Sequence, residues 1–162
     1  MLSKYNLDYK NHKKRLITSF NIKTMESKNI KLIEFLRVRD DRGQLTIAEY
    51  NDHIPFEIRR IYLVSDTVKG AARGDHANKT LQQVIIAIKG SFDVHLDDGS
   101  VKRIVHLDSS NVGLYIGSKI WRRLTSFSND AMCLVLASSN YDNTDYYSDY
   151  DEFINDVNKS SK

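Results

Sequence analysis

The sequence predicts an all-β domain of the barrel or sandwich type, closed by a short C-terminal helix. From residue 29 onward, short apolar or alternating runs recur at roughly regular spacing, as strands of such folds do. Turn residues separate these runs, most clearly in Asp97-Asp-Gly-Ser100. Helical spacing of apolar residues appears only near the C-terminus. The chain has 162 residues, a length that suits one domain with a full hydrophobic core.

Four extended segments are predicted in the first half of the domain. Residues 30–35 form the first, and a turn at residues 40–43 leads to the second at residues 44–49. Residues 58–64 mix β-branched and aromatic side chains, as strands do. Residues 84–88 are all apolar, which predicts a strand that is buried on both faces.

The second half is predicted to contain a hairpin and two more strands. Residues 91–96 and 101–107 alternate between apolar and polar side chains on either side of the Asp-Gly turn. Residues 113–117 and 132–137 complete the set of strands. The strands therefore extend almost to the C-terminal tail.

The tail is rich in tyrosine and aspartate. Residues 141–153 contain five aromatic rings, and such rings seek partners to pack on, which argues against disorder. A terminal helix is expected because four apolar residues follow at helical spacing: Tyr150, Phe153, Ile154 and Val157.

The composition is that of a soluble globular protein, with 41% hydrophobic and 28% charged residues. The single cysteine, Cys133, lies in an apolar run and is expected to be a buried thiol. No disulfide can form within one chain, so we expect a reducing, cytoplasmic location. No apolar run reaches the roughly 18 residues of a membrane span, and none near the N-terminus resembles a secretory signal. We therefore expect no membrane partner.

The positive charge is concentrated at the N-terminus. Residues 1–24 contain six basic residues and one acidic residue, a net charge of +5, which leaves −2 of the chain's total of +3 for the remainder. This basic segment lacks interleaved aromatic residues and periodicity, so we expect no nucleic-acid partner. We interpret residues 1–28 as a basic, flexible extension and residues 29–158 as the domain. Met25 offers an alternative start of translation.

One segment has the spacing of a metal-binding cupin but lacks most of its ligands. Such cupins place His-x-His five residues after a glycine, then a glutamate, then a second glycine. Here Gly70 and Gly90 stand at the two glycine positions, and His76 is the first histidine. Asn78 and Gln83 occupy the positions of the second histidine and the glutamate. Neutral amides suit no tight transition-metal site, so we expect no metal and a pocket that retains one histidine for acid–base chemistry.

A wider set of segments carries a resemblance to a known family. They run in order from about residue 30 to residue 154, and they comprise Asp41-Arg-Gly43, Ile54-Pro-Phe-Glu-Ile-Arg-Arg-Ile-Tyr62, Arg73-Gly-Asp-His-Ala-Asn-Lys79, Leu96-Asp-Asp-Gly99, Leu107-Asp-Ser109, Gly113-Leu-Tyr-Ile-Gly117, Trp121-Arg122, Leu134-Val-Leu-Ala-Ser138 and the tyrosine-rich tail. The chain resembles the dTDP-sugar 3,4-ketoisomerases, which are metal-independent cupins of the WxcM-like group.

The resemblance implies a β-roll cupin, or jelly-roll, fold, usually in a homodimer, and no cofactor. It implies conversion of a dTDP-4-keto-6-deoxyglucose into its 3-keto isomer through an enediol. An aminotransferase would then form a 3-amino sugar for surface polysaccharides such as lipopolysaccharide O-antigens. The stereochemistry at C4 of the product and the identity of the nucleotide stay open.

The reaction needs a base near neutral pH and donors for a developing oxyanion. The family motif is His-x-His, with the leading role usually given to the second histidine, which is Asn78 here. Residues 76 and 78 share one face of a strand, so both should line the pocket. Our hypothesis is that His76 carries the proton while Asn78 polarises oxygen, assisted by Tyr62, Tyr115 or water. We expect His53, His95 and His106 to be surface, loop or minor pocket residues.

Cationic and polar residues in the matched segments are candidates for substrate binding. Arg42, Arg60 and Arg73 are candidate contacts to the diphosphate, because arginine forks suit phosphate oxygens, although each could instead form a structural ion pair. Lys79 is a lesser candidate.

Two further residues are candidates for contact with the sugar or base. Gln83 is expected to bond sugar hydroxyls. Trp121 is expected either to stack on the thymine or sugar or to fill the barrel.

Because Asn78 departs from the family motif, a different ketosugar substrate and two other functions stay open. One is a nucleotide-sugar epimerase, which would pair a histidine with an aspartate and use a tyrosine acid, yet Asp75 beside His76 should point to the opposite face. The other is a non-catalytic cupin that binds a sugar nucleotide. Solvent deuterium would appear at C3 or C4 for an isomerase, at C5 for an epimerase and nowhere for a binding protein.

Overall fold

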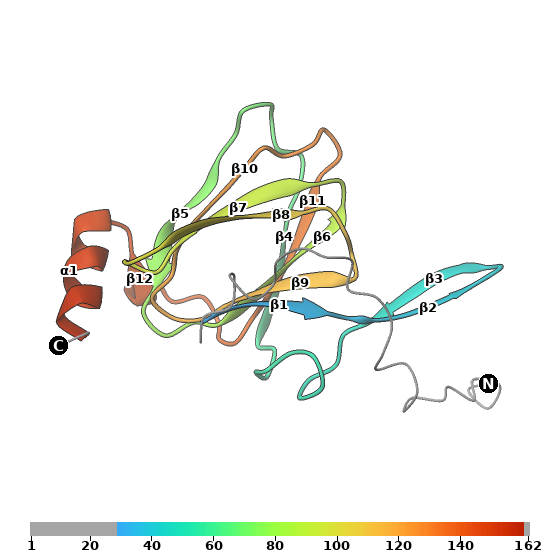
Figure 1. Ribbon diagram of the computed structural model, residues 1–162, viewed down its shortest axis with the longest axis horizontal. Coiled ribbons are helices and arrows are strands. Elements are labelled where there is room, and N and C mark those ends of the chain that lie inside the picture. The colour runs from blue at the N-terminus through green and yellow to red at the C-terminus, as the bar shows by residue number, and fades with distance from the viewer. Residues whose placement is uncertain (1–28, 161–162) are drawn as a thin grey trace.

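The computed structural model describes residues 29–160, which form two facing β-sheets, a projecting hairpin and one α-helix (Figure 1). The expectation of a basic, flexible extension concerns residues 1–28, which lie outside the described residues. The first sheet has the order β1 (Ile30–Glu34), β9 (Val112–Ile116), β6 (Gln83–Lys89), β11 (Met132–Ala137) and β4 (Arg60–Val64). The second has the order β12 (Tyr146–Tyr147), β5 (Arg73–Asn78), β10 (Trp121–Thr125), β7 (Phe92–Asp97) and β8 (Lys102–Leu107).

All strand pairs in the two sheets are antiparallel, and the chain crosses repeatedly from one sheet to the other, as in a jelly roll. The predicted all-β fold with a short C-terminal helix is therefore confirmed. The hairpin of β2 (Leu36–Asp40) and β3 (Gly43–Ile47) extends away from one end of the barrel, whereas α1 (Tyr150–Ser160) lies at the other end (Figure 1).

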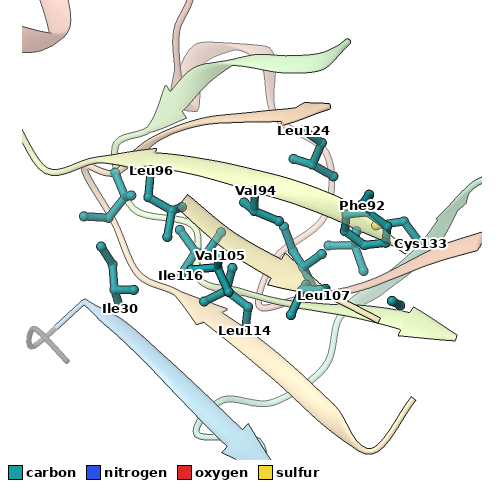
Figure 2. Close-up of a cluster of buried hydrophobic side chains, with 14 of the residues drawn as sticks. Ile30, Phe92, Val94, Leu96, Val105, Leu107, Leu114, Ile116, Leu124 and Cys133 are labelled. Carbon is teal, nitrogen blue, oxygen red and sulfur yellow. The ribbon is translucent and has the colours of Figure 1, made fainter. Parts of the chain in front are cut away.

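The main core fills the space between the two sheets (Figure 2). It is built from alternate residues of each strand, which point to the same face because strand side chains have a period of two. Members from both sheets include Ile85, Phe92, Val94, Leu114 and Val135. The predicted alternation of residues 91–96 and 101–107 supplies most of the second sheet's share of this core, and Leu124 of β10 adds to it. The thiol of Cys133 is buried here too, as expected, and burial raises its pKa to about 12.

A second apolar cluster covers the outer face of the first sheet. Val84, Ile86 and Leu136 pack there against Phe35 and Phe56, which come from the chain around the hairpin. Strand β6 is therefore buried on both faces from Val84 to Ala87, which explains its unbroken apolar sequence. The prediction fails only at Ile88, which is 39% exposed at the end of the strand.

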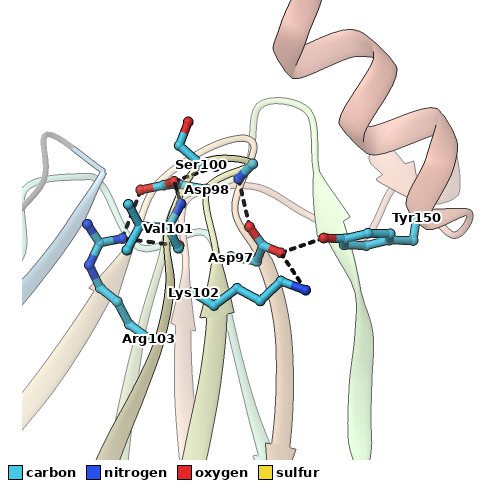
Figure 3. A network of polar contacts seen from close by, with 8 residues as sticks. Asp97, Asp98, Ser100, Val101, Lys102, Arg103 and Tyr150 are labelled. Atoms are coloured by element: carbon cyan, nitrogen blue, oxygen red, sulfur yellow. Dashed lines mark hydrogen bonds and ion pairs between the residues drawn. The ribbon is translucent and has the colours of Figure 1, made fainter.

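Helix α1 packs on the outer face of the second sheet. Phe153 is fully buried between Trp121 and Tyr147, and Ile154 and Val157 pack on the same cluster. The Tyr150 hydroxyl donates a hydrogen bond of 2.6 Å to the Asp97 carboxylate, which also lies 3.7 Å from the Lys102 ammonium (Figure 3). The predicted helical face of Tyr150, Phe153, Ile154 and Val157 is therefore confirmed.

Three strands lack a clear strand pattern in the sequence: β2, β10 and β12. In β2, the residues Arg37, Arg39 and Asp40 leave too few apolar side chains for a strand pattern. Strand β10 contains the pair Arg122-Arg123, and β12 is only two residues long. No helix in the described part of the chain is long and apolar enough to cross a membrane.

Replacing Phe153 by alanine should destabilise the fold by about 3–5 kcal/mol, because a fully buried ring is lost from the interface of α1 with the sheet. Urea unfolding measures the change. Asn155→Ala, at an exposed position of the same helix, is the matched control and should change stability by less than about 0.5 kcal/mol. A loss below about 1 kcal/mol for Phe153→Ala would contradict the packing of α1 described here.

Candidate active site

A β-bulge in strand β5 sets the direction of His76. Strand β10 pairs with β5 so that Arg122 lies opposite His76 and Arg123 opposite Gly74, which leaves Asp75 as the extra residue. Gly74 and Asp75 have φ angles of 93° and 57°, in the left-handed region. A Cβ atom at Gly74 would lie 2.8 Å from the Arg122 carbonyl oxygen, so only glycine fits. The bulge thus turns Asp75 toward Arg123, at 3.7 Å, and keeps His76 beside Arg122.

His76 lies in a half-buried position next to an aromatic ring and a cation. Its imidazole ring is 4.7 Å from the ring of Tyr146, centre to centre. Burial, together with the positive charge of Arg122, lowers the pKa of His76 to about 4, although hydrogen bonding to the Gly74 backbone acts in the opposite direction. The imidazole is therefore neutral at neutral pH, so one ring nitrogen has a lone pair that can accept a proton.

Asn78 and Arg122 form a buried polar pair beside His76. The two residues are 2% and 4% exposed. An Arg122 guanidinium nitrogen donates a hydrogen bond to the Asn78 amide oxygen. The Asn78 amide nitrogen, Nδ2, is buried and has no hydrogen-bond partner among the described residues. Burial lowers the pKa of Arg122 to about 10, so this guanidinium still carries its charge at neutral pH.

Gln83 and Tyr62 form a second polar pair, on the first sheet. The Gln83 amide nitrogen donates a 2.8 Å hydrogen bond to the Tyr62 hydroxyl oxygen, which leaves the hydroxyl proton available for another acceptor. Burial raises the pKa of Tyr62, with a smaller opposing effect from Arg122. Tyr62 interacts electrostatically with both Arg122 and Tyr146, so the two pairs belong to one group.

An aromatic rim borders this group. The guanidinium of Arg60 lies over the ring of Tyr62, at 5.3 Å, and over that of Tyr141, at 5.6 Å. The ring of Tyr141 in turn lies 5.8 Å from that of Tyr146. We call the residues Tyr62, His76, Asn78, Gln83 and Arg122 the polar cluster, and Arg60, Tyr141 and Tyr146 its rim.

The structure thus brings five of the sequence-predicted site residues together: Arg60, Tyr62, His76, Asn78 and Gln83. It places Tyr115 elsewhere, on the outer face of the first sheet. There the Tyr115 ring packs against Phe56, with ring centres 6.4 Å apart, and its hydroxyl donates to the Gln82 side-chain oxygen at 2.8 Å. Tyr115 is opposite Val84 in the register, one residue out of phase with Gln83, so it points away from the polar cluster.

Trp121 also departs from the expectation. Its ring packs against Tyr150 and Phe153, at 5.2 Å and 5.7 Å between ring centres, on the outer face of the second sheet. It therefore does not fill the barrel but anchors α1 on the outside of the sheet. The physical reason is the period of two, which directs Trp121 outward when its neighbour Arg122 points inward.

The remaining predicted cations lie outside the cluster. The Lys79 ammonium donates to the Thr144 carbonyl at 2.9 Å and lies 5.3 Å from the ring of Tyr147. Arg42 pairs with Asp40 at the turn of the projecting β2–β3 hairpin. Arg73 is exposed at the start of β5. Lys79 and Arg42 thus have partners outside the polar cluster, and no contact joins Arg73 to that cluster among the described residues.

Arg122, Tyr141 and Tyr146 belong to the site although the sequence alone predicts no role for them. Arg122 lies two residues before Leu124, so both face the same side of strand β10, and Leu124 faces the core. This pattern is hard to recognise in the sequence because Arg123, on the opposite face, is also charged. Nothing local distinguished Tyr146 from the other tyrosines of the tail.

The other histidines of the described chain lie outside the cluster. A ring nitrogen of His95 is 2.8 Å from the Thr125 hydroxyl, and one of His106 is 2.7 Å from the Asp93 carboxylate. Within residues 29–160, no group of three or more His, Cys, Asp or Glu side chains is arranged to hold a metal ion.

Comparison with known proteins identifies the family. The model of the FdtA family, described as WxcM-like, C-terminal, matches residues 28–158. The TDP-4-oxo-6-deoxy-alpha-D-glucose-3,4-oxoisomerase of Aneurinibacillus thermoaerophilus is 46% identical over 123 residues, which cover 76% of this chain and 88% of that protein.

Two solved structures of one enzyme are similar over most of their length. The sugar 3,4-ketoisomerase QdtA from Thermoanaerobacterium thermosaccharolyticum in complex with TDP has a TM-score of 0.80 and 39% identity, covering 82% of this chain and 97% of that one. A variant of QdtA with asparagine in place of a histidine, in complex with TDP-4-keto-6-deoxyglucose, has the same TM-score and 38% identity, covering 83% and 97%. With matches that span the described barrel, this chain belongs to the FdtA family of WxcM-like proteins.

Proposed function

We propose that this protein is a nucleotide-sugar 3,4-ketoisomerase that converts a TDP-linked 4-keto-6-deoxyglucose into its 3-keto isomer. One observation carries the proposal. A neutral histidine, His76, lies in one cluster with two oriented hydrogen-bond donors, the Tyr62 hydroxyl and the Asn78 amide. Its relatives named as 3,4-ketoisomerases support the same reaction. The isomerase class follows from both lines of support.

Each of these groups suits one need of the reaction. His76 accepts the proton from C3, and the electron pair of that C–H bond forms a double bond to C4 while the C4 oxygen becomes negative. Tyr62 and Asn78 donate hydrogen bonds to the oxygens of this enediolate. A proton passes from the C3 hydroxyl to the C4 oxygen, so the negative charge moves to the C3 oxygen. The protonated His76 then returns its proton to C4, which leaves the ketone at C3.

The rim suits the nucleotide part of the substrate. Arg60 presents a planar guanidinium between the Tyr62 and Tyr141 rings, and its Nε atom is buried without a hydrogen-bond partner in the described chain. A diphosphate oxygen would satisfy this cation. We therefore place the diphosphate at Arg60, and Gln83, which orients Tyr62, next to the sugar.

The epimerase alternative receives less support from the site. Such an enzyme would need an aspartate beside the histidine, but the Asp75 carboxylate forms its ion pair with Arg123.

We also propose that the protein is cytoplasmic and that it has no nucleic-acid or membrane partner, because of its composition. From the reaction class, we propose that its product is a precursor of 3-amino sugars for surface polysaccharides such as O-antigens.

We propose further that the protein is a homodimer. Ile61 and Leu63 on the outer face of edge strand β4 are 61% and 53% exposed, and Leu45 on the projecting hairpin is 57% exposed. An isolated two-stranded hairpin is marginally stable in water, so the β2–β3 hairpin needs a surface to lie on. A second copy of this chain would cover these apolar side chains.

His76→Asn should reduce turnover by at least about 10²-fold, since the base is removed. Proton NMR of the sugar in D2O measures both turnover and the position of deuterium. His95→Asn is the matched control, because that histidine lies on a strand but bonds Thr125 away from the cluster, and it should keep wild-type activity. Binding of TDP should survive in both variants. Full activity of His76→Asn would refute the assignment of the base.

The acid limb of kcat/KM should lie well below the ordinary imidazole pKa of 6.5, near the value of about 4 for His76. The lowered pKa keeps the base unprotonated, so kcat/KM should stay level from about pH 8 to about pH 6 and fall only as the pH approaches that pKa. Steady-state kinetics, with circular dichroism at each pH to verify folding, tests this. An acid limb centred at 6.5 would show that His76 is more solvated than the structure indicates.

Sedimentation equilibrium should give a mass twice that of the chain. The double variant Ile61→Asp, Leu63→Asp should shift the protein toward monomer, because two charges would be buried in the proposed interface. Asp151→Asn, an exposed change on α1, serves as the control. A wild-type protein that remains monomeric at millimolar concentration would exclude the dimer.

A further inference from the structure

The side-chain amide of Asn78 has a fixed orientation. An amide oxygen and an amide nitrogen have almost the same shape, so only their partners distinguish them. A guanidinium can donate hydrogen bonds but cannot accept them. Because Arg122 bonds Asn78, the amide oxygen must face Arg122, and the NH2 group must face the other way.

The NH2 group that results is a buried donor without a partner in the described chain. Leaving a buried donor unsatisfied costs about 1–3 kcal/mol, so such groups are rare and call for an explanation. The unsatisfied NH2 group belongs to Asn78, which lies two residues from His76 on the same strand. His76 in turn faces Arg122 across the strand pair. A ligand oxygen at this place would satisfy the NH2 group.

The charge behind the amide is that of the buried Arg122 guanidinium. Arg122 is 4% exposed, and no carboxylate of the described residues lies within ion-pair distance of it. Besides burial, the pKa of Arg122 depends on four nearby groups, which are Tyr62, Tyr146, Asp145 and the like-charged Arg60. A desolvated cation that bonds an amide oxygen draws electron density from the amide, which makes its N–H groups stronger donors.

We infer that Arg122 is a positioning residue that acts through Asn78, holding the amide with its NH2 group toward the sugar and strengthening that group as a donor to the enediolate oxygen. The inference rests on the proposed ketoisomerase function. It gives Asn78 an active part in the reaction at a position where the cupin spacing would place a histidine. Arg122 and Asn78 then form one functional unit, so the loss of either should disable both.

The test is a double-mutant cycle with Arg122→Met and Asn78→Ala. Each single variant should lower kcat by about 10²-fold, the usual effect of losing one oxyanion donor, with little change in KM or in TDP affinity. The double variant should be no slower than the slower single variant. All rates are measured at pH 8, where His76 is neutral in every variant, so that an altered histidine charge does not contribute.

Matched variants control for folding and for charge. Arg123→Met removes the neighbouring arginine of β10, which pairs with Asp75 on the outer side, and should keep wild-type activity. Arg122→Gln keeps a polar side chain at the site but removes the charge, so it provides a second cycle if Arg122→Met is unfolded by circular dichroism. Its combination with Asn78→Ala should be equally non-additive.

Asn78→Asp provides an independent test with a near-isosteric side chain. The carboxylate pairs with Arg122, so the fold is retained, but an oxygen replaces the NH2 group. This variant should lose at least as much activity as Asn78→Ala, since a negative oxygen would face the developing enediolate.

The outcomes separate the two proposals. If the wild-type protein does not isomerise the sugar, the proposed function fails. If the wild type is active but the losses in the cycle multiply to about 10⁴-fold, or Asn78→Asp stays within about threefold of wild type, the role of Arg122 is overturned while the isomerase proposal stands.

Discussion

The pairing of β5 with β10 around the Gly74 bulge is the constraint on which the site depends. Without the bulge, the residues before His76 would keep the regular alternation, and Asp75 would stand in phase with a different partner on β10. The bulge needs a residue without a Cβ, because Gly74 approaches the Arg122 backbone closely. The same contact that shapes the strand therefore sets the position of both His76 and Arg122.

A buried arginine is tolerated here because the interior of the barrel divides into two parts. One part is the apolar core of residues such as Phe92, Val94 and Leu114 (Figure 2). The other is the polar cluster, where two amides each bond a neighbouring group, Asn78 with Arg122 and Gln83 with Tyr62. These amides stand at the positions that a metal cupin gives to two of its ligands. In their place the site has a fixed positive charge and oriented donors, which can stabilise a negative oxygen.

The sequence predicts those features that depend on neighbouring residues in the chain. It does not predict the role of a residue when that role depends on how two distant strands are paired. The Asp97-Asp-Gly-Ser100 hairpin and the helix followed from residues adjacent in the chain. The role of Arg122 arises from residues 44 positions away, so no window around it could reveal the bond to Asn78. Tyr115 was misplaced for another reason. Strands β6 and β9 are apolar on both faces, so alternation alone could not tell which face carries the polar cluster.

The packing of Trp121 beneath α1 gives the protein an internal optical probe. It is the single tryptophan of the chain, and its ring contacts Tyr150 and Phe153 of the helix rather than the polar cluster. Selective excitation of the indole therefore reports detachment of α1 from the barrel. Because the indole lies on the outer face of the sheet, opposite to the side chains of the polar cluster, its emission reports on the helix and not on that cluster.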